Sequence, residues 1–257
     1  MAEAWRRVQE SVSSMVDFIR AVEDSELALG KLNVLMIGKS GNGKSSFLNT
    51  VDTAIIGRYS FRAMEAQNDG YSQTIQLKME ELDQERIKKT SIRLMDTVGW
   101  VSGVYNIDLF SSILCGKVPK DYYFGNLVNF SVVPENRVHC LVYVVSVDAL
   151  INMDRDELET FAKFGQLARR MEINVFGILT KVDFVMPDDE WTSDTIYRSR
   201  QIKQMMEMLG DSLGCPLKYI FPVSNYADST ILHEERNRLA MHAFSTFIHA
   251  AVSYVKR

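Results

Sequence analysis

The sequence of 257 residues lacks the features that mark several large protein classes. Its 29 Lys and Arg residues are outnumbered by 33 Asp and Glu residues, so the net charge of −4 gives no overall basic character for nucleic-acid binding. It has only 14 Gly and 5 Pro residues, below the ~12 % of average usage, which excludes a collagen-like or linker-like chain. We therefore expect a globular protein with no nucleic-acid partner.

Cysteines and long apolar runs are also scarce. Cys115, Cys140 and Cys215 are odd in number and share no CxxC spacing, which argues against a disulfide framework and for a reducing compartment. The longest uncharged stretch, 239–255, contains His, Ser and Thr and is shorter than the ~20 apolar residues of a membrane span. The first residues show no apolar segment of a signal peptide. A cytoplasmic protein without a transmembrane segment is the expectation.

What the chain does have is an alternation of two patterns, in a composition of 46% hydrophobic and 24% charged residues. Short apolar runs predict strands at 32–37, 75–79, 92–95, 138–147, 173–179 and 219–223. Helical spacing of apolar residues predicts helices at 44–55, 106–115, 154–171, 194–210 and 231–255. Such alternation is typical of an α/β fold with three layers, in which helices cover both faces of a mostly parallel sheet.

An amphipathic segment precedes this alternation. Apolar residues recur there at steps of three and four, at Trp5, Val8, Val12, Met15, Ile19 and Val22. We predict an N-terminal amphipathic helix over 1–29, ended by Gly30, and a single domain over 30–257. The helix either packs back on the domain or mediates dimerisation.

Residues 38–45 read GKSGNGKS and fit the pattern GxxxxGK[ST], between a predicted strand and a predicted helix. In such a loop, successive backbone N–H groups and the helix N-terminus bind a polyphosphate. We expect Lys44 to contact the β- and γ-phosphates and to act in catalysis, and the Ser45 hydroxyl to ligate Mg²⁺. The expected phosphate-binding residues are Ser40, Gly41, Asn42, Gly43, Lys44, Ser45 and Ser46.

Two further segments are candidates for sensing the γ-phosphate. Residues 96–99 read DTVG, a DxxG pattern after the strand at 92–95. We expect Asp96 to hold Mg²⁺ through water and the Gly99 N–H to contact the γ-phosphate. In the first switch, Thr74 is the candidate that closes on Mg²⁺ and takes part in catalysis, with Ser72 as its competitor.

Base recognition is predicted from two strand ends. Residues 180–183 read TKVD, and the Asp183 carboxylate can accept two hydrogen bonds, from guanine N1–H and the 2-amino group, whereas adenine offers neither donor. The Lys181 stem is expected along the base plane. After the last strand, a backbone N–H in the segment of Ser224 and Asn225 is a candidate for guanine O6, although an ordinary turn is an open alternative. The expected base-binding residues are Thr180, Lys181, Asp183, Ser224 and Asn225.

Other segments resemble one particular family. Residues 113–119 (ILCGKVP) with 122–124 (YYF), 137–140 (RVHC) and 223–226 (VSNY) are similar to stretches of the interferon-induced protein 44 family. The phosphate loop is also similar to that of immunity-associated GTPases of the septin-related group. The resemblance implies a three-layer P-loop GTPase (Ras-like) fold that binds GTP or GDP with Mg²⁺, in an interferon-inducible cytosolic protein with roles in antiviral defence and growth restraint. Longer members of the family carry an additional N-terminal domain, of which only 1–29 could be a remnant here.

The catalytic power of such a site depends on how it orients water. Ras-type hydrolysis uses a Gln after DxxG, and this chain has Trp100 there, so slow hydrolysis is expected. Trp100 either anchors a partner or forms a lid. Arg58 and Arg62 are candidates for charge-stabilising arginines in cis or are surface residues. The remaining water-orienting candidates are Asn68, Asp69 and Gln73.

The leading hypothesis is a GTP/GDP switch of innate antiviral immunity with slow Mg²⁺-dependent hydrolysis, stimulated by a protein partner or by homodimerisation in the GTP state. The alternative is a non-catalytic interaction protein in which the nucleotide is structural or absent. A small-molecule phosphotransferase is disfavoured because the residues 180–183 have no role in one. The long connection at 117–136 is either a partner-binding insertion or an extra layer over the sheet.

Overall fold

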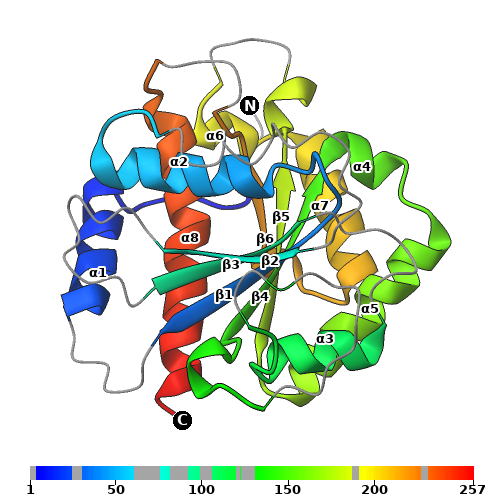
Figure 1. The fold of residues 1–257 in the computed structure, drawn as a ribbon. Coiled ribbons are helices and arrows are strands. Elements are labelled where there is room, and N and C mark those ends of the chain that lie inside the picture. Colours follow the sequence, from blue (N-terminus) through cyan, green and yellow to red (C-terminus); the bar gives the residue numbers. More distant parts are fainter. Residues whose placement is uncertain are drawn as a thin grey trace.

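A computed structural model shows a central β-sheet with helices on both faces (Figure 1). It describes residues 4–24, 31–60, 76–81, 92–98, 106–119, 122, 131–186, 191–226 and 231–257. The strands are β1 (Leu32–Ile37), β2 (Gln76–Glu81), β3 (Ile92–Val98), β4 (Cys140–Ser146), β5 (Asn174–Thr180) and β6 (Ile220–Val223). The helices are α1 (Val12–Asp24), α2 (Lys44–Ile56), α3 (Ile107–Leu114), α4 (Val147–Ile151), α5 (Arg155–Arg170), α6 (Ser193–Ile196), α7 (Arg200–Leu213) and α8 (Glu234–Val255). Single turns of 3-10 helix are η2 (Pro134–Asn136), η3 (Val182–Val185) and η4 (Leu217–Tyr219).

The strand order in the sheet is β2-β3-β1-β4-β5-β6. All neighbouring strands are parallel except the edge strand β2, which is antiparallel to β3. Crossover helices between parallel strands place a helical layer on each face. The predicted α/β architecture with a mostly parallel sheet is therefore confirmed.

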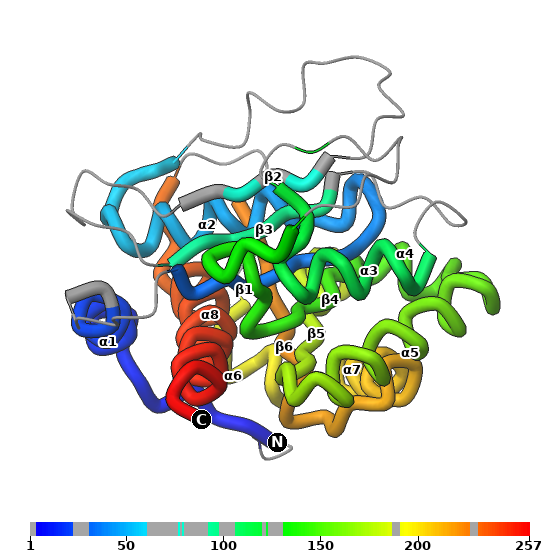
Figure 2. Tube along the Cα trace, turned by 60° about the horizontal axis from the view of Figure 1, so that its bottom comes forward, coloured from blue at the N-terminus to red at the C-terminus, as the bar shows by residue number. Residues whose placement is uncertain are grey.

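Two apolar cores lie on opposite faces of the sheet. Successive side chains of β1 point to opposite faces of the sheet and so enter different cores. Leu35 and Ile37 pack with α3, α5 and α7, whereas Val34 and Met36 pack with α1, α2 and α8. In Figure 2, α1 accordingly lies beside α8, on the side of the molecule away from α5 and α7. The apolar runs of the sequence are continuous because each strand is covered on both faces.

The N-terminal helix is shorter than the predicted 1–29, because residues 4–11 are not helical. Ser11 Oγ accepts a hydrogen bond of 3.2 Å from a backbone N–H in the first turn of α1, which favours a helix start at this point. Before it, the Arg6 guanidinium donates to Ile220 O at 2.7 Å and so holds the segment against the start of β6. The segment packs on the domain, and the division of the chain at residue 30 stays a prediction.

Two other boundaries differ from the sequence prediction. The helix expected at 194–210 is divided into α6 and α7, because the Ser199 side chain accepts a hydrogen bond from Ile202 N and starts a new helix. Strand β3 extends beyond Met95, since pairing with β2 continues to Val98. Asp96 therefore lies inside a strand instead of following it. The other predicted elements agree with the structure within a few residues.

The order of the strands determines where a ligand can bind. Strand β1 lies between β3 and β4, so the chain leaves β1 toward one side of the sheet and later returns on the other. In open parallel sheets, ligands bind beyond the carboxyl ends of the strands at such a reversal. The carboxyl end of β1 continues directly into residues 38–43.

Candidate nucleotide-binding site

The loop between β1 and α2 is built around glycines. Gly41 and Gly43 have φ values of 81° and 87°, in the left-handed region that other residues adopt at a cost. A Cβ atom on Gly38 would lie 2.1 Å from the carbonyl oxygen of Val144, so the loop passes β4 too closely for a side chain. Helix α2 then begins at Lys44. The loop thus leads into a helix N-terminus, the arrangement that favours anion binding.

Lys44 lies beneath this loop with only 6% of its side chain exposed. Its Nζ donates hydrogen bonds to Gly38 O at 2.8 Å and to Lys39 O at 3.1 Å, and lies 3.9 Å from Asp96 Oδ1. Burial lowers the pKa of Lys44, and the Asp96 carboxylate opposes that shift. A buried ammonium with one carboxylate near it is a suitable partner for phosphate oxygens.

Ser45 and Asp96 provide the oxygen atoms that a magnesium site needs. Ser45 Oγ donates to Asp96 Oδ2 at 3.1 Å, which joins the start of α2 to β3. A hydroxyl and one carboxylate, completed by phosphate and water oxygens, are a donor set that suits Mg²⁺. Within the part of the chain that the structure describes, no group of three or more His, Cys, Asp or Glu could hold a metal ion. The residues therefore fit Mg²⁺ that binds together with a phosphate ligand.

Interactions that the sequence did not predict attach the loop to the sheet. The Asn42 side chain donates to Val144 O at 3.0 Å and accepts from Ser146 Oγ at 3.2 Å. The Thr180 hydroxyl donates to Asn42 O at 2.7 Å. Thr180, which we expected near the base, thus contacts the phosphate loop. The only signal in the sequence was the polar residue that ends each of β4 and β5, Ser146 and Thr180.

Lys39 extends from the loop toward α5. Its Nζ lies 2.5 Å from Glu157 Oε2, and the Glu157 side chain is only 1% exposed. Glu157 is in the first turn of α5, whose N-cap is Asp154. A buried carboxylate with a cationic partner holds the outer side of the loop. Glu157 was not predicted, because its own segment contains nothing but an ordinary amphipathic helix.

The predicted base-binding residues lie beyond β5. Lys181 has φ 60° and its Nζ lies 3.2 Å from Asp148 Oδ1, in α4. The Asp183 carboxylate, in η3, lies 3.8 Å from the NH2 atom of Arg236 at the start of α8. Neither Asp148 nor Arg236 was a predicted neighbour, since both come from distant segments.

Ser224 and Asn225 follow β6. Ser224 Oγ is fully buried and has no hydrogen-bond partner among the described residues. Because buried polar atoms are normally hydrogen-bonded, this hydroxyl is a candidate for a contact with a ligand. The Asn225 side chain donates to Gly43 O at 3.1 Å and accepts from Thr50 Oγ1 at 3.4 Å. Asn225 therefore joins the base end of the site to the phosphate loop through its side chain. The predicted contact of a backbone N–H with the base stays a prediction.

Several predicted residues fall in segments outside the described residues. They are Arg62, Asn68, Asp69, Ser72, Gln73, Thr74, Gly99 and Trp100. Arg58 is described and exposed. The switch assignments, and with them the water-orienting residue, thus stay predictions. What the structure brings together is the phosphate loop, Asp96 and the ends of β4, β5 and β6.

The sequence of this chain matches a known protein family. The family model described as Septin matches residues 29–209. The chain belongs to the septin family. The match includes the phosphate loop, residues 96–99 and residues 180–183, and ends before the last strand and α8.

Among curated proteins, this septin-family chain is similar to interferon-induced protein 44-like of Homo sapiens. The two are 24% identical over 244 residues, which cover 89% of this chain and 53% of the relative. The expected resemblance to the interferon-induced protein 44 family is thereby confirmed. The chain spans about half the length of the curated relatives it matches.

Among solved structures, the chain is similar to Toc33 from Arabidopsis thaliana in complex with GDP and Mg²⁺. The TM-score is 0.54 at 15% identity, over 94% of this chain and 91% of that one. A second structure, from a study of dimerisation and GTPase activity of the chloroplast translocon components atToc33 and psToc159, gives a TM-score of 0.50 at 16% identity, over 100% and 96% of the chains. These likenesses concern the fold, and they confirm the predicted three-layer P-loop GTPase fold of this septin-family chain. Among its described residues, no helix has the length and apolar character to cross a membrane.

Proposed function

We propose that this protein binds guanine nucleotides with Mg²⁺ and acts as a GTP/GDP switch. The observation that carries the proposal is the loop at 38–45, in which glycines turn the backbone around the buried ammonium of Lys44. Asp183 and the Ser224 hydroxyl, which has no hydrogen-bond partner among the described residues, lie beyond the carboxyl ends of the neighbouring strands β5 and β6. The septin family match supports the same function.

The residues of the candidate site have separate roles in this proposal. Lys44 exchanges its bonds with loop carbonyls for bonds with the β- and γ-phosphates. Ser45 and Asp96 would hold Mg²⁺, Asp96 through a water molecule, and the ion would supply positive charge to the phosphates. Asp183 accepts hydrogen bonds from guanine N1–H and the 2-amino group, which selects guanine over adenine. Lys181 gives up its contact with Asp148 to lie along the base.

We further propose that GTP hydrolysis is slow. A Trp at position 100 offers no side-chain acceptor to orient the attacking water. Stimulation by a second copy of the chain is consistent with the structure of atToc33 and psToc159, whose published description calls dimerisation important for GTPase activity. The similarity to interferon-induced proteins supports a role in innate immunity. We propose that this role is antiviral and cytoplasmic.

The test is a calorimetric titration of the folded protein with GTP, GDP and ATP, with Mg²⁺ and with EDTA. We expect GTP and GDP to bind in the presence of Mg²⁺ and ATP to bind far more weakly. Light scattering in each state then measures assembly, and phosphate release measures hydrolysis. Absence of heat from both guanine nucleotides would overturn the proposal and favour the interaction protein without nucleotide.

A further inference from the structure

Arg236, in the first turn of α8, is a cation that the proposed function has not used. Its NH2 atom lies 3.8 Å from Asp183 Oδ2, and the side chains of the pair are only 19% and 20% exposed. The Nε atom of Arg236 is buried and lacks a hydrogen-bond partner within the described part of the chain. A long ion pair alone contributes little to stability. Its importance therefore depends on how firmly the guanidinium is held.

Two aromatic rings hold that guanidinium. The Cζ atom of Arg236 lies 5.9 Å from the ring centre of Trp191 and 5.6 Å from that of Tyr226, both within the range of cation–π attraction. Trp191 also stacks on the His233 ring at 5.1 Å. Burial, followed by the charge of Arg236, lowers the pKa of His233, which favours the neutral imidazole beside the cation.

Tyr226 is itself fixed from two sides. Its hydroxyl oxygen accepts a hydrogen bond of 2.7 Å from His233 N, just before α8. Its backbone N–H donates to Thr50 Oγ1 in α2 at 3.2 Å. The ring that lies against Arg236 is thus attached both to α8 and to the helix that follows the phosphate loop.

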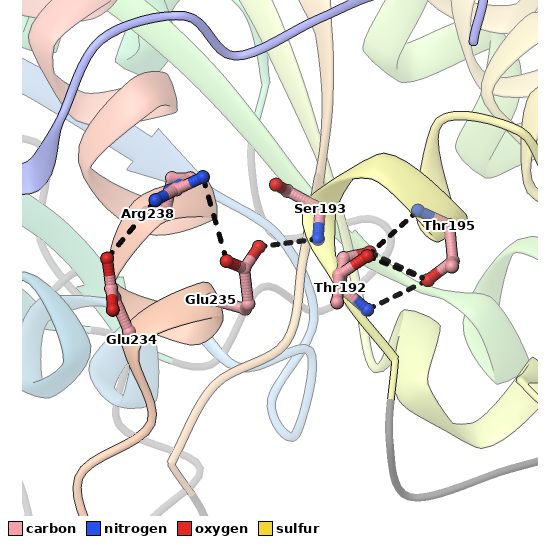
Figure 3. Close-up of polar contacts among 6 residues, drawn as sticks. All are labelled: Thr192, Ser193, Thr195, Glu234, Glu235 and Arg238. Atoms are coloured by element: carbon pink, nitrogen blue, oxygen red, sulfur yellow. Dashed lines mark hydrogen bonds and ion pairs between the residues drawn. The ribbon is translucent and has the colours of Figure 1, made fainter.

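The segment that carries Trp191 is also attached to α8 (Figure 3). Glu235 Oε2 accepts a hydrogen bond of 2.6 Å from Ser193 N, and Glu235 Oε1 lies 3.7 Å from Arg238. Thr192 and Thr195 form a capping box that starts α6 directly after Trp191. Trp191 and Arg236 therefore keep their relative position through contacts that do not involve Asp183.

We propose that Arg236 is a positioning residue for base recognition, which fixes the plane of the Asp183 carboxylate so that it accepts two hydrogen bonds from guanine. This inference rests on the proposed function. A carboxylate that turns freely satisfies a single donor with either oxygen atom, but two donors at once require one orientation. Loss of Arg236 therefore weakens binding of guanine, which has two donors, more than binding of hypoxanthine, which has only N1–H.

The experiment compares GDP with inosine diphosphate, which lacks the 2-amino group, on the full chain with Arg236→Gln. We expect the ratio of GDP affinity to inosine diphosphate affinity to fall about tenfold, because one hydrogen bond to a charged acceptor is lost. The affinity for ADP, which offers Asp183 no donor, stays unchanged. Affinities are measured by calorimetry, and the thermal unfolding midpoint verifies that the variant is folded.

The matched control is Arg238→Gln, two residues further along α8. Arg238 lies 3.1 Å from Glu234 Oε1 and 3.7 Å from Glu235 Oε1, so this variant removes the same charge without contact to Asp183. The inference is wrong if both variants have the same ratio as the parent chain. It is also wrong if Arg236→Gln lowers the affinities for GDP and ADP by the same factor, since such a result reflects only the loss of a positive charge near the site.

A second variant covers the case in which Arg236→Gln does not fold. Arg236→Lys keeps the charge but loses the planar group between the two rings, and we expect a smaller fall of the same ratio. An unchanged ratio in Arg236→Lys, measured where the Gln variant is unfolded, counts against the inference. Failure of the proposed function is distinguished by the parent chain, which would then bind neither GDP nor inosine diphosphate.

Discussion

The phosphate end and the base end of the candidate site are built in different ways. The phosphate end is one continuous segment, in which backbone groups surround Lys44 and only 6% of that side chain is exposed. The base end consists of side chains that follow β5, follow β6, precede α6 or begin α8, and a fifth of the Asp183 side chain is exposed. A ring of backbone amides binds any polyphosphate, whereas side chains distinguish one base from another. Affinity and specificity should therefore be separable by mutation.

The largest expected effect is at the phosphate end. Lys44→Ala removes the ammonium beneath the loop, and we expect GDP and ADP affinity to fall together by at least about a hundredfold. Because Gly38 O and Lys39 O lose a donor in this variant, its thermal unfolding midpoint without nucleotide is measured to verify that it is folded. Calorimetry with both nucleotides measures the loss. Lys203→Ala, on the surface of α7, removes the same charge and should leave both affinities unchanged.

A smaller and more selective effect is expected at the base end. Asp183→Asn replaces an acceptor by an amide that offers a donor, so GDP affinity should fall about 10- to 100-fold. Affinity for xanthosine diphosphate should rise, since xanthine has a keto group where guanine has its amino group. Competition of the two nucleotides on one sample measures the change. An unaltered preference for GDP would contradict the role of Asp183.

Asn225 joins the phosphate end of the site to the base end, and removal of its side chain tests whether the two ends can be separated. Asn225→Ala deprives Gly43 O of its donor and loosens the loop, so GDP and ADP affinity should both fall about fivefold. Ser224→Ala is the neighbouring control, whose hydroxyl has no partner within the described chain, and ADP binding should be unaffected. If Asn225→Ala weakened GDP alone, the side chain would belong to the base end only.

The smallest effect on nucleotide binding is expected at the amino end of β4, a central strand, away from the carboxyl ends that form the candidate site. His139 Nδ1 accepts a hydrogen bond of 2.9 Å from Asn33 N, and burial, with a smaller contribution from Arg137, lowers its pKa to about 4. The unfolded chain then binds a proton below pH 6.5 that the folded chain binds only near pH 4. Stability is therefore lost as pH falls between these values, by about 3 kcal/mol.

Urea unfolding at several pH values measures this loss. His139→Asn keeps an acceptor near Asn33 N but does not titrate, so its stability should depend less on pH while its GDP affinity equals that of the parent chain. His242, whose pKa burial also lowers to about 4, accounts for part of the remaining dependence. Equal pH dependence in the variant and the parent would show that His139 has no share in it.

Part of the candidate site could be predicted because its residues are close in sequence. The segment at 38–45 needs only its own glycines and a helix start, so its pattern is visible in the chain. Asp96 and Asp183 were predicted because each belongs to a short pattern, at 96–99 and 180–183, next to an apolar run. Glu157, in contrast, could not be predicted, since its segment resembles the exposed face of any amphipathic helix.

By itself the sequence determined the alternation of strands and helices, the phosphate loop and the order of the motifs, because these depend on local conformation and on which residues avoid water. The tertiary structure decided the rest. It held the non-helical segment before α1 against β6 through Arg6, turned the Asn225 side chain toward Gly43 and placed Arg236 beside Asp183. Such contacts join segments tens to hundreds of residues apart, and only the folded chain brings them within the few ångströms at which hydrogen bonds and ion pairs act.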